Sequence, residues 1–323
     1  FRSWLVYELS GSPLKLGLLG AAGAVPQILV SLFGGVLADR LDKRRVLMAT
    51  SMVIALLLAL LSALDFTGVV EVWHVILIAA LIGFTSGLDW PARQAFFTRL
   101  IDREHMTSAV ALNSVLWQST RMIVPAIGGI VIALSSTAVV FLAAALGFLT
   151  MFFVLVSMDV THRVTPRGDP LQQFLEGLKF IGSTRLFAIM IPLTWVLTFF
   201  GVSYIQLMPA FADILGVDER GFGFLLSASG VGSVTGTALV VFVQHTRRLG
   251  WLIIIASLCS TLALFGFSIT TGFAEVTSHA YAIAMSFVLV TSLFNSMYLI
   301  SSMTVLQMRV PDELRGRVID RKS

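Results

Sequence analysis

Residues 34–45 read Gly34-Gly35-Val36-Leu37-Ala38-Asp39-Arg40-Leu41-Asp42-Lys43-Arg44-Arg45 and separate two apolar runs, Leu16 to Leu37 and Val46 to Leu64. Each run is long enough to cross a hydrocarbon core of about 30 Å as a helix that rises about 1.5 Å per residue. Six of the seven residues from Asp39 to Arg45 are charged, which predicts a tight turn at a membrane surface. Four of these six charges are basic, which indicates the cytoplasmic surface.

The composition excludes an ordinary soluble domain. The chain is 57% hydrophobic and 12% charged, whereas about 25% of residues are charged in a typical globular protein. The net charge of +4 comes from short loops between apolar runs and not from a basic stripe with interleaved aromatics, so we expect no nucleic-acid partner. The single cysteine, Cys259, lies in an apolar run and predicts neither a disulfide nor a cysteine metal site.

The rest of the chain contains seven further runs of membrane-spanning length, which gives nine complete spans in an all-α polytopic membrane protein. The apolar segment Phe1 to Leu9 is short and opens without a charged signal-peptide start, and we interpret it as the outer end of a truncated first helix. The seven further runs are Val72 to Leu88, Ala109 to Leu134, Ala138 to Met158, Leu186 to Leu207, Phe222 to Val243, Trp251 to Ile269 and Ala280 to Val305.

The distribution of charge over the loops supports this topology. Every second loop should be basic if the spans are counted correctly. The loops predicted to be cytoplasmic contain 18 of the 22 Lys and Arg residues, and the outward loops carry mainly acids. These cytoplasmic loops are 38–45, 89–106, 159–185, 244–250 and 306–323.

The longest polar interruption predicts a division into an N-terminal helix bundle, 1–158, and an incomplete C-terminal bundle, 186–323. The linker between them, 159–185, spaces its apolar residues for one face of a surface helix. A weak repeat supports this division, because similar charged segments, 98–104 and 308–314, each follow the fourth helix of a half. Repeated halves are typical of secondary transporters. By this logic two helices of the second half are missing at the C-terminus.

Several motifs resemble those of the major facilitator superfamily. The pattern Gly35-x-x-x-Asp39-Arg40-x-Asp42-Lys43-Arg44 is similar to the loop 2–3 signature of that superfamily, with Asp42 in place of the usual glycine. The resemblance implies a two-bundle helical fold and secondary transport by alternating access. Four more stretches are similar to the branch that contains the enterobactin exporter and macrolide efflux proteins: 4–13, 91–94, 111–114 and 311–317.

This resemblance implies a conformational latch at the 34–45 segment. The family's matching aspartate, here Asp39, holds the two bundles together on the cytoplasmic side when the cavity opens outward. Gly35 would allow close helix approach, and a partly desolvated Asp39 needs cationic partners. The alternative is that these charges only fix topology. The further latch candidates are Arg40, Lys43, Arg44, Asp89 and Arg93.

The segment from Thr120 to Gly129 resembles the antiporter motif of the same superfamily. Pro125 should kink the helix, and Gly128 and Gly129 should permit close packing on the next helix. Thr120 and Val124 stand where the motif has glycines, and packing alone would explain Gly128 and Gly129 equally well.

Arg121 lies near the middle of an apolar span, where an arginine costs about 2.5 kcal/mol or more unless it faces a cavity or a partner. Trp117 and Gln118 fall on the same helix face and are expected to line the same cavity. Arg121 would bind an anionic substrate group or pair with an acid such as Glu8. A purely structural ion pair is the alternative.

The first segment contains two further candidates for substrate binding or coupling. Glu8 is a candidate protonatable carboxylate, although an acid at this position is also typical of an interface. Arg2 precedes it by six residues, or roughly 9 Å along a helix axis. Four candidate cavity residues in the second half, each also explicable by packing, are Trp195, Tyr204, Gln206 and Asn295.

No sequence signature of an enzyme, a nucleotide site or a metal site is present, and we expect no cofactor. Gly230-x-Gly232-x-x-x-Gly236 lies inside a predicted span, where it indicates helix packing. The leading hypothesis is proton-coupled export of small amphipathic molecules, such as drugs or siderophores, by a monomer in the bacterial cytoplasmic membrane. The alternatives are a metabolite or lysophospholipid carrier on the same fold and, more distantly, a membrane-embedded lipid-modifying enzyme, for which no catalytic cluster is present.

Overall fold

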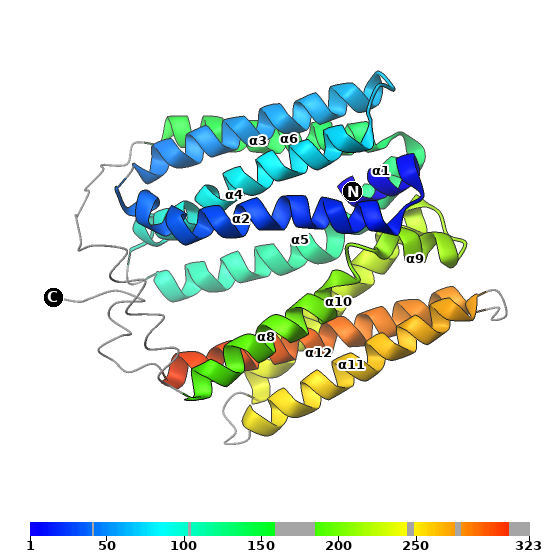
Figure 1. Cartoon of the computed structure of the whole chain (residues 1–323). Coiled ribbons are helices and arrows are strands. Elements are labelled where there is room, and N and C mark those ends of the chain that lie inside the picture. Colours follow the sequence, from blue (N-terminus) through cyan, green and yellow to red (C-terminus); the bar gives the residue numbers. More distant parts are fainter. Residues whose placement is uncertain (41, 103–104, 159–184, 244–248, 275–278, 310–323) are drawn as a thin grey trace. The chain divides into compact units, whose positions relative to one another are not determined.

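The computed structural model describes residues 1–323 apart from 41, 103–104, 159–184, 244–248, 275–278 and 310–323 (Figure 1). The described part contains helices and no strands. Every long helix is rich in apolar residues. In a bilayer no water is available to the backbone N–H and C=O groups, and a helix provides their hydrogen bonds internally. The helices are α1 (Arg2–Ser10), α2 (Pro13–Arg40), α3 (Lys43–Phe66), α4 (Val72–Leu100), α5 (Met106–Leu134), α6 (Thr137–Ser157), α8 (Arg185–Ser203), α9 (Met208–Ile214), α10 (Glu219–Val243), α11 (Leu249–Gly272) and α12 (Ala280–Arg309).

Eight of these helices are long and apolar enough to cross a membrane. Helices α8 and α9, separated by a short break, make a ninth if they count as one span. Each of the nine predicted spans overlaps one of these segments, so the predicted fold class is confirmed. Helix α1 has nine residues and ends at Gly11, whose φ of 57° is the left-handed conformation that glycine adopts readily.

The predicted turn from Asp39 to Arg45 is wrong in its extent, because helices occupy most of it. Helix α2 continues to Arg40, and α3 already begins at Lys43. Asp42 is the N-cap of α3, and its carboxylate accepts hydrogen bonds from the backbone N–H of Arg44 at 2.9 Å and of Arg45 at 3.4 Å. A carboxylate at this position satisfies N–H groups that have no partner within the helix. The charged residues therefore start a helix instead of interrupting one.

The predicted end of the third span at Leu88 is also wrong, since α4 continues through Pro91 to Leu100. The charged residues that suggested a loop pair with one another along the helix. Asp89 and Arg93 are four residues apart, on the same face, and form an ion pair. Much of the predicted loop 89–106 is therefore helical.

The predicted span from Leu186 to Leu207 is wrong at its C-terminal end. Helix α8 ends at Ser203, and the chain turns before α9 begins at Met208. Pro209 lies in the first turn of α9, where a residue without a backbone N–H fits well. Tyr204 and Gln206, two candidate cavity residues, therefore lie in the break between helices.

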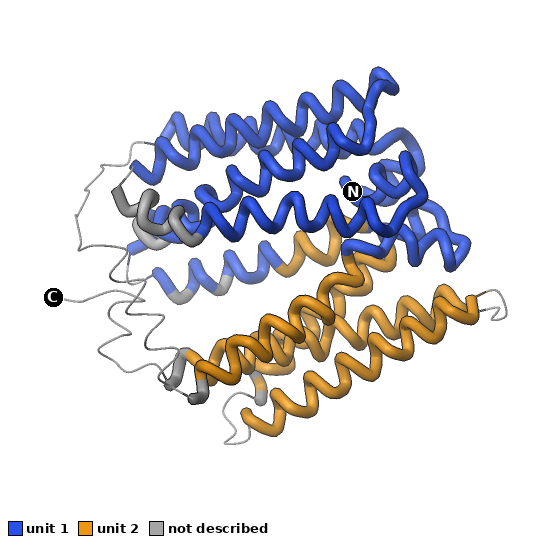
Figure 2. The backbone as a smooth tube through the Cα atoms, in the orientation of Figure 1, with its two compact units in different colours: residues 1–117, 126–173, 206–223 blue, residues 118–125, 174–205, 224–323 orange. Residues whose placement is uncertain are grey.

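The chain forms two compact units (Figure 2). Unit 1 comprises 1–117, 126–173 and 206–223, and unit 2 comprises 118–125, 174–205 and 224–323. The predicted bundles at 1–158 and 186–323 stay a prediction, and the linker 159–185 lies almost entirely outside the described residues.

Within unit 1, α2 packs along α4, and α3 packs along both α4 and α6. Its apolar core joins these helices to α1 through the buried side chains Leu5, Leu16, Leu61, Val75 and Phe141. Within unit 2, α11 packs along α12. Its core contains the buried side chains Val240, Ile253, Ala256, Met297 and Tyr298.

Candidate functional site

Unit 2 contains a chain of hydrogen-bonded polar side chains inside apolar helices. Gln118 of α5 donates from Nε2 to the Thr237 hydroxyl of α10 at 2.8 Å, and the Thr237 and Ser296 hydroxyls lie 2.9 Å apart. The Thr237 hydroxyl also donates to the backbone oxygen of Ser233 at 2.8 Å. Since a hydroxyl has one proton and two lone pairs, Thr237 accepts from both Gln118 and Ser296. The network therefore fixes the Gln118 amide against α10.

A second part of the network surrounds Tyr204. The Tyr204 and Ser292 hydroxyls are 2.9 Å apart, and Ser292 lies 2.7 Å from the hydroxyl of Ser229. The Tyr204 side chain is buried and its ring packs against Phe267, with centroids 6.0 Å apart. Tyr204 thus lies in the hydrogen-bonded interior of unit 2, and its role as a cavity residue stays a prediction.

Close packing of α10 on α12 brings these hydroxyls together. A Cβ added at Gly232 would overlap the backbone oxygen of Leu289, and one added at Gly236 would overlap that of Leu293. The prediction that this glycine motif serves helix packing is confirmed. Five hydroxyl residues of the network escaped the sequence analysis, although their spacing of four residues in apolar spans was a usable signal: Ser229, Ser233, Thr237, Ser292 and Ser296.

Arg121 lies beside this network. Gly230 of α10 lies against the backbone of Arg121 and Met122, where an added Cβ would come within 2.7 Å of the Met122 Cα. The Arg121 side chain is exposed, and its positive charge acts on the Tyr204 hydroxyl. Among the described residues, no carboxylate forms an ion pair with it. The structure thus brings Arg121, Gln118 and Tyr204 together within unit 2.

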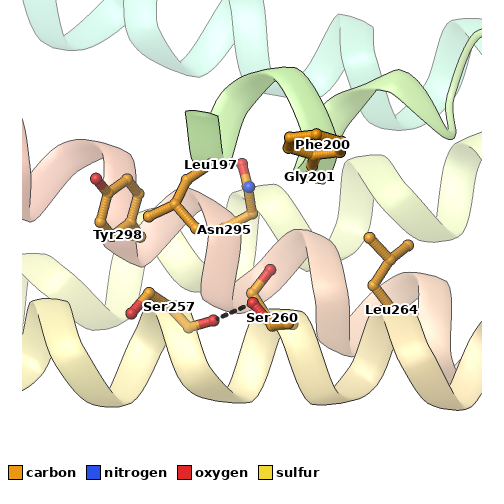
Figure 3. Close-up of a pocket in the computed structure, with 9 residues that line it drawn as sticks. Leu197, Phe200, Gly201, Ser257, Ser260, Leu264, Asn295 and Tyr298 are labelled. Atoms are coloured by element: carbon orange, nitrogen blue, oxygen red, sulfur yellow. Dashed lines mark hydrogen bonds between the residues drawn. The ribbon is translucent and has the colours of Figure 1, made fainter. Parts of the chain in front are cut away.

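Asn295 lies in a separate cavity between α8, α11 and α12 (Figure 3). Its amide points from α12 toward α8, and a Cβ added at Gly201 would approach its Nδ2 to 3.0 Å. The wall on α11 carries hydroxyls, and Thr261 donates to the backbone oxygen of Ser257 at 2.9 Å. Trp195 of α8 is 70% exposed and does not line this cavity.

Unit 1 contains a second cavity with a polar lining. Arg2 of α1 and Gln27 of α2 line it together with Gln206, which lies between α8 and α9. The Nη1 atom of Arg2 is buried and has no hydrogen-bond partner among the described residues. Gln206 donates to the backbone oxygen of Leu16 at 3.4 Å and packs over Gly20. Arg2 and Gln206, predicted from opposite halves of the sequence, therefore line one cavity.

Gln27 was missed by the sequence analysis, although a single amide in an apolar span is a signal of the same kind as Arg121. Its position follows from close packing of α4 on α2. A Cβ added at Gly83 would overlap the Gly23 oxygen, and one added at Gly87 would lie 2.8 Å from the Gln27 oxygen. The four-residue spacing of Gly83 and Gly87 is the small-residue pattern that permits such packing.

Glu8 lies in the last turn of α1, outside the candidate spans, and its side chain is exposed. Partial desolvation of the carboxylate, followed by the like charges of Glu219 and Asp65, raises the pKa of Glu8 above its ordinary value. The preceding residue, Tyr7, donates from its hydroxyl to Asp213 of α9 at 2.9 Å. Glu8 belongs to unit 1 and Arg121 to unit 2, so their pairing stays a prediction.

Two of the latch candidates form a buried cluster in unit 1. Asp89 accepts hydrogen bonds from Arg93 at 2.9 and 3.1 Å and from the Thr50 hydroxyl at 2.6 Å. Arg44 instead donates to the backbone oxygens of Leu155 and Val156 at the end of α6, at 2.7 and 2.8 Å. A cation at this position is favourable because the last carbonyls of a helix have no partner within it.

The remaining latch candidates are Lys43, Gly35, Asp39 and Arg40. Lys43 is buried, at 5% exposure. The side chains of Gly35, Asp39 and Arg40 lie outside the described part of the structure. The latch role of all these residues stays a prediction.

The predicted packing partner of the antiporter-like motif is wrong. Gly128 and Gly129 do not pack on the next helix, α6. A Cβ at Gly128 would overlap the Phe1 ring, and one at Gly129 would lie 2.6 Å from the Glu219 oxygen at the start of α10. These two glycines therefore leave room for Phe1 and for the start of α10. Helix α5 is continuous through Pro125, and the kink and the antiport role stay predictions.

Trp117 precedes Gln118 in α5, and its ring meets that of Trp90 edge-on, with centroids 5.6 Å apart. Its expected role in lining the cavity of Arg121 stays a prediction.

Comparison with known proteins agrees with this architecture. The family model MFS_3, described as "Transmembrane secretion effector", matches residues 2–320. The staphyloferrin A transporter of Staphylococcus aureus is 25% identical over 325 residues, which cover 98% of this chain and 78% of that protein. The enterobactin exporter EntS of Shigella boydii is 26% identical over 326 residues, which cover 98% of this chain and 72% of that protein.

Solved structures support the fold independently. The inward-open xylose transporter XylE from E. coli superposes with a TM-score of 0.65 at 16% identity, covering 97% of this chain and 77% of XylE. A bacterial metal transporter gives a TM-score of 0.54 at 12% identity, covering 98% of this chain and 81% of that structure. The chain thus belongs to the transmembrane secretion effector family of the major facilitator superfamily, and it is a multi-pass membrane transporter of a small molecule and not an enzyme.

Proposed function

We propose that this transporter exports siderophore-like amphipathic molecules by alternating access, in exchange for protons. The names of its relatives support this substrate class, since one is a staphyloferrin A transporter and another an enterobactin exporter. No nucleotide-binding motif occurs in the sequence, which favours an ion gradient as the energy source. The protein works as a monomer in the bacterial inner membrane, with loops 38–45, 89–106, 159–185, 244–250 and 306–323 in the cytoplasm.

The single observation that carries the proposal is the charge of Arg121 within a candidate span. Among described residues it has no carboxylate partner, and a charge at membrane depth is costly unless it faces water, a partner or a ligand. We propose that Arg121 binds an anionic group of the substrate. Gln118 and Tyr204 lie beside it and supply an amide and a hydroxyl as further hydrogen-bonding groups.

The other candidates take supporting roles in this proposal. Asn295 supplies an amide in its own cavity, and Trp195 and Trp117 supply apolar contact to the amphipathic substrate. Glu8 carries the proton, because its raised pKa makes protonation easier near neutral pH. Pro125, Gly128 and Gly129 form the bending point of α5, and the latch residues around Asp39 and Asp89 close the cytoplasmic side.

The test is transport into proteoliposomes with an acidic interior, with staphyloferrin A and enterobactin as the probes. Protons leave as substrate enters, so we expect accumulation that a protonophore abolishes. Arg121→Gln should lower the initial rate at least tenfold, while Arg121→Lys retains part of it. The matched control is Arg220→Gln, which removes an exposed arginine in the first turn of α10.

Three results would contradict different parts of the proposal. Accumulation that ignores the pH gradient refutes proton exchange. Transport of lysophosphatidylcholine without either probe refutes the substrate class and supports the lysophospholipid carrier. An unchanged rate for Arg121→Gln removes that residue from the mechanism.

A further inference from the structure

The polar cavity of unit 1 has features of a built anion site. Five of the residues that line it are Arg2, Ser3, Gln27, Gly20 and Gly23, from α1 and α2. The two glycines leave space beside α2 that larger side chains would fill. Its charged and amide side chains come from separate segments of the chain, so the fold and not one local sequence assembles it.

The guanidinium of Arg2 has donors without acceptors. Its Nη1 is buried and has no hydrogen-bond partner within the described residues. A guanidinium carries five N–H donors in a planar fork that matches the two oxygens of a carboxylate. A buried charge that lacks a partner is costly, and a bound carboxylate would remove that cost.

The two amides have their positions fixed by packing. The backbone of Gln27 is set by the contact with Gly87 of α4, and the side chain of Gln206 is held over Gly20, where an added Cβ would approach its Cγ to 3.3 Å. An amide N–H₂ donates as readily to a carboxylate as to a carbonyl. One cation and two positioned amides thus line one cavity, and their N–H groups suit an acceptor-rich anion.

We infer that the Arg2, Gln27 and Gln206 cavity binds a carboxylate group of the transported molecule. The inference rests on the proposed function in naming the transported molecule as the source of the carboxylate. It adds a substrate class to that proposal: the molecule carries a free carboxylate that unit 1 recognises, separately from the group that Arg121 receives in unit 2. Esterified or neutral molecules of similar size are bound more weakly.

The first test measures binding to the purified full-length protein in detergent, with citrate as the probe and trimethyl citrate as its uncharged counterpart. We expect citrate to raise the unfolding temperature and the ester to leave it unchanged. Arg2→Gln should weaken citrate binding at least tenfold, and Arg2→Lys less, because an ammonium lacks the planar fork. Arg220→Gln, in the same unit, serves as the matched control and should bind citrate as the native protein does.

A second readout separates ligand binding from a structural role. Without ligand, Arg2→Gln should unfold at a higher temperature than the native protein, because the substitution removes a buried charge that has no partner. A structural ion pair or packing role predicts the opposite sign. Gly17→Ala is a further control, since nothing lies within 4 Å of the added Cβ.

Equal binding of citrate and its ester overturns the inference, and so does unchanged citrate binding by Arg2→Gln or a lower unfolding temperature of that variant without ligand. These outcomes are distinct from failure of the proposed function. Gradient-driven transport of the probes can persist in proteoliposomes while citrate selectivity fails. Conversely, citrate binding can depend on Arg2 in a protein that transports neither siderophore.

Discussion

The close crossing of α2 and α4 makes a sharp prediction about Gly87. A Cβ at this position would lie 2.8 Å from both the Gln27 oxygen and the Val30 Cβ. The backbone oxygen cannot rotate away as a side chain would. The two helices would therefore have to separate by roughly 0.6 Å to reach an ordinary van der Waals distance, which close-packed interiors resist.

Gly87→Ala should consequently destabilise the protein relative to a matched substitution in open space. The control is Gly147→Ala in α6 of the same unit, where nothing lies within 4 Å of the added Cβ. Alanine at an unhindered helix position gains up to about 1 kcal/mol over glycine. Overpacking costs about 1–3 kcal/mol, so the free energy of unfolding should differ between the two variants by about 1–3 kcal/mol, with Gly87→Ala the less stable.

The assay is reversible unfolding of the two variants in the same detergent, followed by helical circular dichroism. A smaller second effect should accompany the loss of stability. Because Gly87 sets the position of Gln27, Gly87→Ala should also weaken citrate binding, whereas Gly147→Ala should not. Equal stability of the two variants would refute the account of this helix crossing.

Two further predictions concern the ionisable side chains of unit 1. Asp89→Asn should lower the free energy of unfolding by about 1–3 kcal/mol, because the half-buried Arg93 keeps a hydrogen-bond acceptor but loses its counter-charge. Thermal unfolding measures this loss, and the exposed Asp102→Asn should show none. Glu8→Gln should raise the unfolding temperature at pH 8 and leave it unchanged at pH 4. The raised pKa of Glu8 means that its charged form opposes folding. This penalty is absent below the ordinary value of 4.5 and complete only above the raised pKa. An equal effect at both pH values would contradict the desolvation of Glu8 and its repulsion by Glu219 and Asp65.

Hydrophobic length and charge were enough to predict which segments of the chain form helices. They failed at helix ends, where hydrogen bonds between particular side chains decide the outcome. Asp42 starts a helix because it caps backbone N–H groups, and Asp89 continues one because Arg93 lies four residues further on. In a hydropathy profile both aspartates predict a loop. Only the groups that each carboxylate binds show that one begins a helix and the other lies within one.

The candidate site was predictable where a single residue broke an apolar pattern, and not where the site depended on which helices meet. Arg121 and Gln118 stood out in the sequence for this reason. Gln206 was identified, but nothing in the sequence indicated that it would share a cavity with Arg2, which lies 204 residues earlier in the chain. Gln27 was missed because its partner in packing, Gly87, lies on a helix that the sequence places two spans later.

The arginines of the described chain differ in a way that supports a ligand role for two of them. Arg93 and Arg44 are both bonded within the protein, Arg93 to the Asp89 carboxylate and Arg44 to backbone oxygens at the end of α6. Arg2 begins α1 with its Nη1 buried, and Arg121 lies within a candidate span. Among the described residues neither of these two forms an ion pair, although an unsatisfied charge in such surroundings is costly. Charges kept without partners at these positions are explained by anionic groups that arrive with the substrate.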